Sequence, residues 1–123
     1  MACSVVYALR GAVTVENDTP EEIIPAVREM FEKLLELNFL GEDELVFIQF
    51  SQTKDLRSLN AASALRRGGH GSGVPLFCTQ EADVEGGLEK CIRTLVLVGH
   101  EERSEKKMVY LGRASALRPD LKR

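Results

Sequence analysis

The stretch TPEEIIPAVREMFEKLLEL at residues 19–37 and the stretch LVFIQF at residues 45–50 decide the fold class of this chain. In the first stretch, apolar residues recur every three to four positions with charged residues between them, which predicts an amphipathic helix. The second stretch is short, apolar and rich in β-branched and aromatic residues, which predicts a largely buried strand. A helix followed closely by a buried strand indicates an α/β protein.

Local signals predict where this helix begins and ends. Thr19 and Glu22 have the spacing of a capping box, in which each side chain accepts a hydrogen bond from the other residue's backbone amide. Pro20 lies where its missing N–H is tolerated, so the helix is expected to begin there. We expect Gly41 to end the helix a few residues beyond Leu37.

Further elements are expected on both sides of these two. The sequence predicts strands at residues 5–9, 74–78, 92–98 and 108–111, and a helix at residues 61–67 capped by Asn60. We expect Gly11 to turn the chain out of the first strand, Pro75 to mark an edge strand, and the charged run at 101–107 to be a solvated connection. The order β, α, β, α, β, β, β predicts one α/β (α+β) domain over residues 1–123, with a mixed five-stranded sheet packed with helices.

The charge and length of the chain disfavour several classes of function. Its 123 residues carry 16 basic and 19 acidic side chains, and the net charge of −3 disfavours binding to nucleic acid. The longest apolar run, Val5–Leu9, has five residues, far short of the roughly 18 typical of a membrane span. The N-terminus shows no signal-peptide pattern, so we expect a cytoplasmic protein that binds neither nucleic acid nor membrane.

Cysteine and histidine positions give no signature of a disulfide framework or a metal site. Cys3, Cys78 and Cys91 form no CxxC pair, and their odd number suits a reducing compartment. His70 and His100 are not spaced as zinc ligands, either to each other or to a cysteine pair. We therefore expect no bound metal.

Arginines stand out among the basic residues, and three of them, Arg10, Arg93 and Arg118, fall where expected strands meet loops. One interpretation is that an arginine-rich composition scatters arginines at strand ends. The other is that they converge on an anion, because the planar guanidinium matches both oxygens of a carboxylate and keeps its charge when partly buried. Two or three converging arginines would suit a small dicarboxylate.

Other groupings of reactive residues are weaker. Cys78 and His70 could form a nucleophile and base, but the glycine-rich loop at 68–73 does not fix their geometry. That loop lacks the Lys-Ser/Thr of a P-loop and is expected to be a flexible connection or a lid. Glu81 and Asp83 could act as acid and base, although the residues around them equally suit an exposed turn.

Three separated blocks resemble the monofunctional chorismate mutases of the AroH class. They are RGAVTVE at residues 10–16, CTQEADVEGGLEKCIR at residues 78–93 and LRPDL at residues 117–121. Between them, Asp55-Leu56, Arg66 and Val109-Tyr110-Leu111 also fall at matching positions, so the resemblance covers nearly the whole chain. The sixteen-residue middle block is the most specific part.

The resemblance implies an isomerase of aromatic amino acid biosynthesis that converts chorismate to prephenate by an intramolecular Claisen rearrangement. It implies no cofactor and no covalent intermediate. It also implies a homotrimer that forms a pseudo-α/β barrel, with active sites in the clefts between subunits.

The resemblance further implies roles for residues inside the site. Arg93 would contact the ether oxygen and a carboxylate, while Arg10 and Tyr110 would hold a carboxylate. Glu81 would take the ring hydroxyl, and Cys78 would lie beside that hydroxyl without acting as a nucleophile. Because no proton moves in this reaction, catalysis would come from holding the reactive conformer and from placing charges where charge develops.

Other residues would contact the substrate near the entrance. The resemblance places Arg66 and Arg118 at the mouth, with Leu117 and Phe77 among the residues that bind substrate. The entrance also departs from better-known members, because Asn60 stands where they have an aromatic residue, and Ser63 stands where they have a lysine. With Ser63 in place of a cation, we expect Arg66 or Arg118 to supply more of the attraction for the dianion.

Two other classes of function agree less well with the sequence. A non-catalytic trimeric binder of carboxylated metabolites would need the arginines but would have no use for Glu81 against an electron-poor ring. A small RNA-binding module would need clustered aromatic residues on a basic face, which the acidic balance of the chain disfavours.

Overall fold

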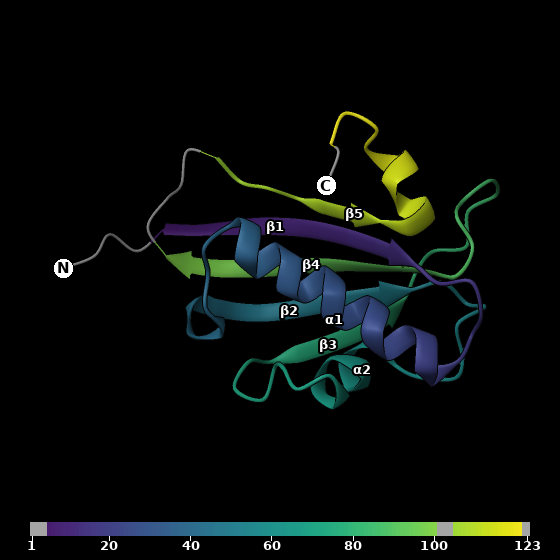
Figure 1. The fold of residues 1–123 in the computed structure, drawn as a ribbon, viewed down its shortest axis with the longest axis horizontal. Coiled ribbons are helices and arrows are strands. Elements are labelled where there is room, and N and C mark those ends of the chain that lie inside the picture. The colour runs from purple at the N-terminus through teal and green to yellow at the C-terminus, as the bar shows by residue number, and fades with distance from the viewer. Residues whose placement is uncertain (1–4, 101–104, 122–123) are drawn as a thin grey trace.

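The computed structural model describes residues 5–100 and 105–121 (Figure 1). Its elements, in chain order, are β1 Val5–Thr14, α1 Pro20–Leu37, the 3₁₀ helix η1 Glu42–Glu44, β2 Leu45–Gln52, α2 Ala61–Arg67, β3 Leu76–Gln80, β4 Cys91–His100, β5 Val109–Leu111 and the 3₁₀ helix η2 Gly112–Leu117. This confirms the predicted order of strands and helices. The two 3₁₀ helices were not predicted. None of the described helices is both long enough and apolar enough to cross a membrane.

The five strands form one mixed sheet in the order β3-β2-β4-β1-β5. β4 lies at its centre and runs antiparallel to β1 and to β2, whereas β1 pairs with β5 and β2 with β3 in parallel. The expected edge strand is confirmed, since β3 lies at one edge and Pro75 immediately precedes it. The Pro75 carbonyl accepts a hydrogen bond from the Ile48 amide at 3.0 Å.

One face of the sheet packs against α1 and carries the main core (Figure 1). Ile48 and Phe50 of β2 are fully buried there, as are Ile23, Val27 and Leu34 of α1. Burying each such side chain contributes about 1.5–3 kcal/mol, so the amphipathic pattern of residues 19–37 accounts for much of the driving force. We call this side of the sheet the helix face.

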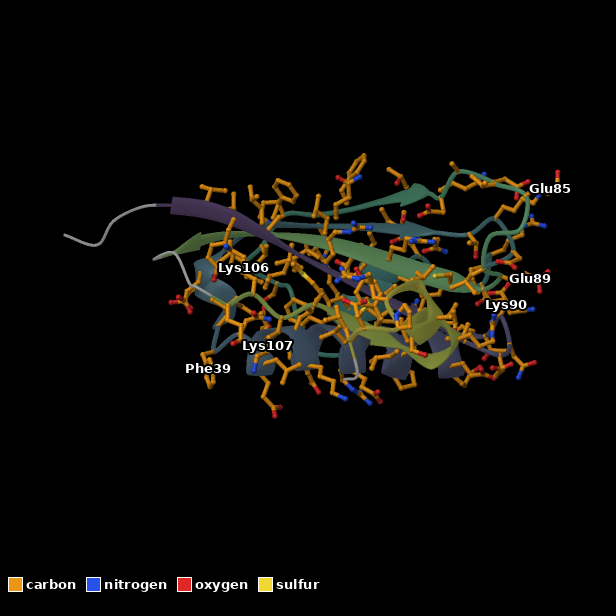
Figure 2. All side chains as sticks on the ribbon, turned by 90° about the horizontal axis from the view of Figure 1, so that it is seen from above. Phe39, Glu85, Glu89, Lys90, Lys106 and Lys107 are labelled. Atoms are coloured by element: carbon orange, nitrogen blue, oxygen red, sulfur yellow. The ribbon has the colours of Figure 1, made fainter. Side chains whose placement is uncertain are left out.

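The other side of the sheet, which we call the outer face, has little cover. Figure 2 shows side chains along most of it with no helix packed over them. Among the residues that point there, Val6 is 62% exposed, Phe77 64% and Leu95 38%. Only one end is covered, where η2 packs on Ala12 and Tyr110. The outer face is therefore a partly apolar surface next to a small second core.

β1 is longer than expected, and the prediction that Gly11 turns the chain out of the strand is wrong. The strand continues to Thr14. A Cβ atom at Gly11 would lie 3.1 Å from Leu34 Cδ1, 3.1 Å from the Val109 carbonyl oxygen and 3.3 Å from Thr94 Cγ2. The glycine is therefore explained by the close approach of α1, β4 and β5, which local sequence does not reveal.

The predicted start of α1 at Pro20 is confirmed, but neither end of the helix is formed as predicted. The Thr19 side chain makes no capping hydrogen bond. Instead, the Glu22 carboxylate accepts hydrogen bonds from the amides of Glu16 and Asn17, at 3.1 and 3.0 Å, which ties the connection after β1 to the helix. The prediction that Gly41 ends the helix is wrong, because the helix already ends at Leu37 and is capped by Asn38. Phe39 then adopts a left-handed φ of 55°. The cap predicted for α2 is confirmed, since Asn60 accepts hydrogen bonds from the amides of Ala62 and Ser63.

The glycine-rich loop at 68–73 is anchored, which argues against the predicted flexible connection or lid. The two ring nitrogens of His70 lie 2.7 Å from a Glu32 carboxylate oxygen and 2.8 Å from a Glu42 carboxylate oxygen. The second Glu42 oxygen accepts a hydrogen bond from the Gly71 amide at 2.8 Å. His70 thus joins the loop to α1 and to η1.

A buried asparagine fixes the approach to β5. Asn38 is 2% exposed, and its amide donates hydrogen bonds to the carbonyls of Leu34 and Lys107, both at 2.8 Å. Its oxygen accepts from the Lys107 amide at 2.8 Å. Figure 2 shows Phe39 and Lys107 at the same end of the molecule. Residues 101–104 of the predicted charged run lie outside the described residues, and Lys107, at the end of the run, is held rather than freely solvated.

We expect Gly11→Val to lower the free energy of unfolding by about 1–3 kcal/mol, because the new side chain would overlap α1 and the backbone of β5. Urea denaturation of both proteins measures the difference. Gly73→Val is the matched control, since nothing lies within 4 Å of a Cβ atom there. Equal stability of the two variants would contradict the close approach at Gly11.

We expect the contribution of His70 to stability to fall as pH rises. Burial lowers the pKa of His70, but hydrogen bonds to Glu32 and Glu42 outweigh it, and the net pKa is raised. A raised folded-state pKa stabilises the protein fully below the unfolded value of about 6.5, and the contribution is lost as pH rises through the folded-state pKa.

Comparison with His70→Gln tests this, because glutamine does not titrate. The wild type should exceed the variant in unfolding free energy by more at pH 6 than at pH 8. The two ion pairs are partly exposed, so the change should be about 1 kcal/mol or less. A gap that widens with rising pH would contradict the assignment.

Candidate active site

One row of residues crosses all five strands on the outer face. Tyr110 lies beside Ala12, Ala12 beside Arg93, Arg93 beside Ser51, and Ser51 beside Thr79. Neighbours in such a row point to the same side of the sheet. The strand register therefore brings Ser51, Arg93 and Tyr110 onto one surface, although they are far apart in the sequence.

The next row places Arg10 on the same surface. Arg10 lies opposite Leu95 of β4. On its other side Leu95 pairs with Gln49, and Gln49 lies beside Phe77. Arg10 and Arg93 are therefore diagonal neighbours, a relation in which Cα atoms are about 7–8 Å apart. Both arginines line one hollow of about 230 Å³. The prediction had placed Arg10 after the first strand, but it lies within β1.

Arg93 is only partly satisfied by its protein neighbours. Its Nε lies 3.6 Å from Glu81 Oε1, close enough for an ion pair but too far for a hydrogen bond. The same Glu81 oxygen accepts a hydrogen bond from the Ser51 hydroxyl. Arg93 Nε is buried and has no hydrogen-bond partner among the described residues. A buried donor without a partner is costly, so this atom is suited to meet an oxygen of a ligand.

Arg93 also lines a second, larger hollow. It measures about 400 Å³ and is lined by Glu81, Asp83 and the loop that leads to β4. Asp83 forms an ion pair with Lys54 at 2.7 Å and does not contact Glu81, so the acid and base pair suggested by the sequence does not form. Arg93 thus lines both hollows, and the larger one falls in the volume range typical of small-molecule sites.

The C-terminal segment covers one side of this surface. Tyr110 is 5% exposed and packs with Leu117 of η2 in the second core. Arg118 follows η2 and forms a bidentate ion pair with Asp120. Its Nε donates to Asp120 Oδ1 at 3.1 Å, and its Nη2 donates to Asp120 Oδ2 at 2.8 Å. These hydrogen bonds raise the pKa of Arg118 and lower that of Asp120. Arg118 lies near Tyr110, which also contributes to the raised pKa.

Two predicted site residues lie away from this surface in the single chain. Cys78 alternates with Phe77 and turns to the helix face, where its Sγ contacts Gln52 Oε1 at 3.3 Å. Burial raises the pKa of the Cys78 thiol. Arg66 is exposed on α2, whose N-terminal residues adjoin Cys78. His70 is engaged by glutamates, so a Cys78–His70 pair does not form.

The described residues contain no group of three or more acidic, cysteine or histidine side chains that could hold a metal ion. Cys78 and Cys91 are free thiols, and burial raises the pKa of Cys91 as well. Cys3 and the side chain of His100 lie outside the described residues. The site offers guanidinium, hydroxyl and phenol groups, which can donate hydrogen bonds to an anion, and the Glu81 carboxylate, which can accept a hydrogen bond from a ligand hydroxyl.

Sequence reasoning missed two residues that line the hollow with Arg10 and Arg93. These are Gln49 and Ser51. The signal was present in β2, where polar residues alternate with the buried Ile48 and Phe50 and must therefore face the other side of the sheet. The apolar residues of the strand led instead to the prediction of a largely buried strand.

Comparisons with known proteins agree on one family. Residues 6–121 match the family described as chorismate mutase type I. The chain is 39% identical over 117 residues to the chorismate mutase AroH of Bacillus subtilis strain 168, covering 94% of this chain and 92% of that protein. It is 42% identical over 118 residues to the chorismate mutase AroH of Thermus thermophilus, covering 94% and 96%.

A solved structure shows the same fold. The chorismate mutase from Clostridium thermocellum superposes with a TM-score of 0.84 at 38% sequence identity, covering 89% of this chain and 98% of that one. This confirms the α/β fold with a mixed five-stranded sheet and the resemblance noted in the sequence. The chain belongs to the type I chorismate mutases, which are isomerases of aromatic amino acid biosynthesis.

Proposed function

We propose that this chain converts chorismate to prephenate by an intramolecular Claisen rearrangement, with no cofactor and no covalent intermediate. The observation that carries the proposal is the buried, unpartnered Nε of Arg93, which borders a hollow shared with Arg10. Chorismate has two carboxylates and an ether oxygen, and all three can accept hydrogen bonds from guanidinium groups.

The chemistry of the rearrangement explains why such a site would accelerate it. The carbon–oxygen ether bond breaks while a new carbon–carbon bond forms, so negative charge grows on the ether oxygen and the ring becomes electron-poor. Arg93 would stabilise that oxygen and hold a carboxylate, and Arg10 and Tyr110 would hold the substrate in its folded conformer. The ether oxygen carries more negative charge in the transition state than in bound chorismate. A fixed positive charge beside it therefore stabilises the transition state more than the ground state.

Glu81 and Cys78 would act at the ring. The Glu81 carboxylate, held beside Arg93, would accept a hydrogen bond from the ring hydroxyl and face the electron-poor ring. Cys78 would lie beside that hydroxyl as a neighbour. The raised pKa of its thiol keeps it protonated, which suits a contact residue better than a nucleophile.

We propose that three chains assemble so that their outer faces pack together into a pseudo-α/β barrel. Val6, Phe77 and Leu95 are large apolar residues on that face with substantial exposure, as expected of a surface that another subunit covers. Arg66 and Cys78 lie on the opposite side of the same sheet. A cleft between two subunits could combine the outer face of one chain with Arg66 and Cys78 of its neighbour.

At the mouth of such a cleft, Arg66 and Arg118 would attract the dianion, and Leu117 and Phe77 would line the substrate. Arg118 is held by Asp120 in the described chain, so it would have to exchange this contact to close over a carboxylate. The cytoplasmic location, the single domain over residues 1–123 and the lack of a nucleic-acid or membrane partner stay predictions of the sequence.

Arg93→Lys should lower kcat by about 10²–10³, because a point charge cannot serve the ether oxygen and a carboxylate together. The fall of chorismate absorbance in the ultraviolet measures turnover. Arg28→Lys, an exposed change on α1, is the matched control and should leave kcat unchanged. Normal turnover by Arg93→Lys would contradict the role of Arg93, and no turnover by the wild type would contradict the proposed function.

Leu95→Glu should yield monomers and abolish most activity, because a carboxylate in the middle of the outer face would be buried against a neighbouring chain. Analytical ultracentrifugation gives the oligomeric state. The control is Phe39→Glu, an apolar-to-acidic change at a residue that is 78% exposed beyond α1. A trimeric, fully active Leu95→Glu protein would disprove this mode of assembly.

A further inference from the structure

We propose that Ser51 is a positioning residue, which holds Glu81 off Arg93 and so keeps the guanidinium available to substrate. The inference rests on the proposed function, because it explains how Arg93 and Glu81 can occupy one site without neutralising each other. Ser51 belongs to none of the roles implied by the resemblance.

One oxygen of the Glu81 carboxylate faces both Ser51 and Arg93. Glu81 Oε1 accepts the hydrogen bond from Ser51 Oγ and also faces Arg93 Nε at 3.6 Å. Charge-assisted hydrogen bonds between a guanidinium and a carboxylate are normally about 2.7–2.9 Å long, so the ion pair is open. The Ser51 hydroxyl supplies the donor that this oxygen would otherwise seek from Arg93.

The strand register explains why serine can do this. Ser51 lies directly beside Arg93 across the β2–β4 pair, on the outer face, and both line the same hollow. Glu81 follows β3, and its amide bonds to the Gln52 carbonyl at 2.8 Å, so its backbone is fixed next to β2. The hydroxyl therefore reaches the carboxylate from the side, between the two strands that carry Glu81 and Arg93.

The electrostatic consequence concerns the free enzyme. Arg93 and Glu81 are both about one-third exposed or less, so a closed ion pair between them would be only weakly screened by solvent. Chorismate would then have to break that pair before its own oxygens could reach Nε. With Glu81 held by Ser51, Nε stays buried and unpartnered, ready to donate to the ether oxygen.

Ser51→Ala removes the donor and lets Glu81 close on Arg93. We expect kcat/KM for chorismate to fall about 10- to 100-fold, the range for losing a hydrogen bond to a charged group. Binding of prephenate, measured by calorimetry, should weaken as well. Ser51→Thr keeps the hydroxyl and should retain most of the activity.

Thr79→Val is the matched control, because Thr79 lies beside Ser51 in the same row and its hydroxyl makes no hydrogen bond among the described residues. It should leave kcat/KM within about twofold of the wild type, whereas the loss of a hydrogen bond to a charged group costs far more. The thermal unfolding midpoint of each variant shows whether any loss of activity reflects unfolding.

A double-mutant cycle separates positioning from a general structural role. In a Glu81→Gln background there is no carboxylate to close on Arg93, so adding Ser51→Ala should change kcat/KM by about twofold or less, as expected for coupled residues. An equal loss in both backgrounds would overturn the inference, as would wild-type activity of Ser51→Ala or a Ser51→Thr protein as impaired as Ser51→Ala. An inactive wild type would instead defeat the proposed function, and prephenate binding would still report on Ser51.

Discussion

The site is organised around a guanidinium that the protein leaves partly unsatisfied. A buried donor with no hydrogen-bond partner lowers stability, and Arg93 Nε is such a donor. The arrangement persists because Arg93 belongs to the central strand of the sheet, where β1 and β2 flank it on both sides. The packing of α1 on the helix face supplies the stability that offsets this cost on the outer face.

Sequence reasoning succeeded where the determining contacts are local. The start of α2 could be predicted because Asn60 bonds to amides only two and three residues further on. β1 was predicted too short because the groups that require a glycine at position 11 come from α1, β4 and β5. The helix start at Pro20 was predicted correctly, but Glu22 bonds to the amides of Glu16 and Asn17 in the connection after β1, an interaction that the capping-box pattern does not contain.

The site itself could be predicted only in part, and the limit is the strand register. The resemblance named Arg10, Arg93 and Tyr110, and all three share the outer face, but nothing in their spacing gives the rows that bring them together. Ser51 could not be predicted as a site residue, because a serine in a strand has no distinguishing sequence signal. Its importance emerges only when β2 is paired with β4.

The contact between Asn38 and Lys107 has a consequence for how this fold tolerates change. Because both backbone groups of Lys107 bond to Asn38, the alignment of β5 is set after the chain returns from β4, not by the length of that return path. Insertions or deletions before Lys107 would therefore change only the connection that precedes the Asn38–Lys107 hydrogen bonds. The phenol of Tyr110 would keep its position. A change in the length of this connection would therefore leave Tyr110 beside Ala12, where the site needs it.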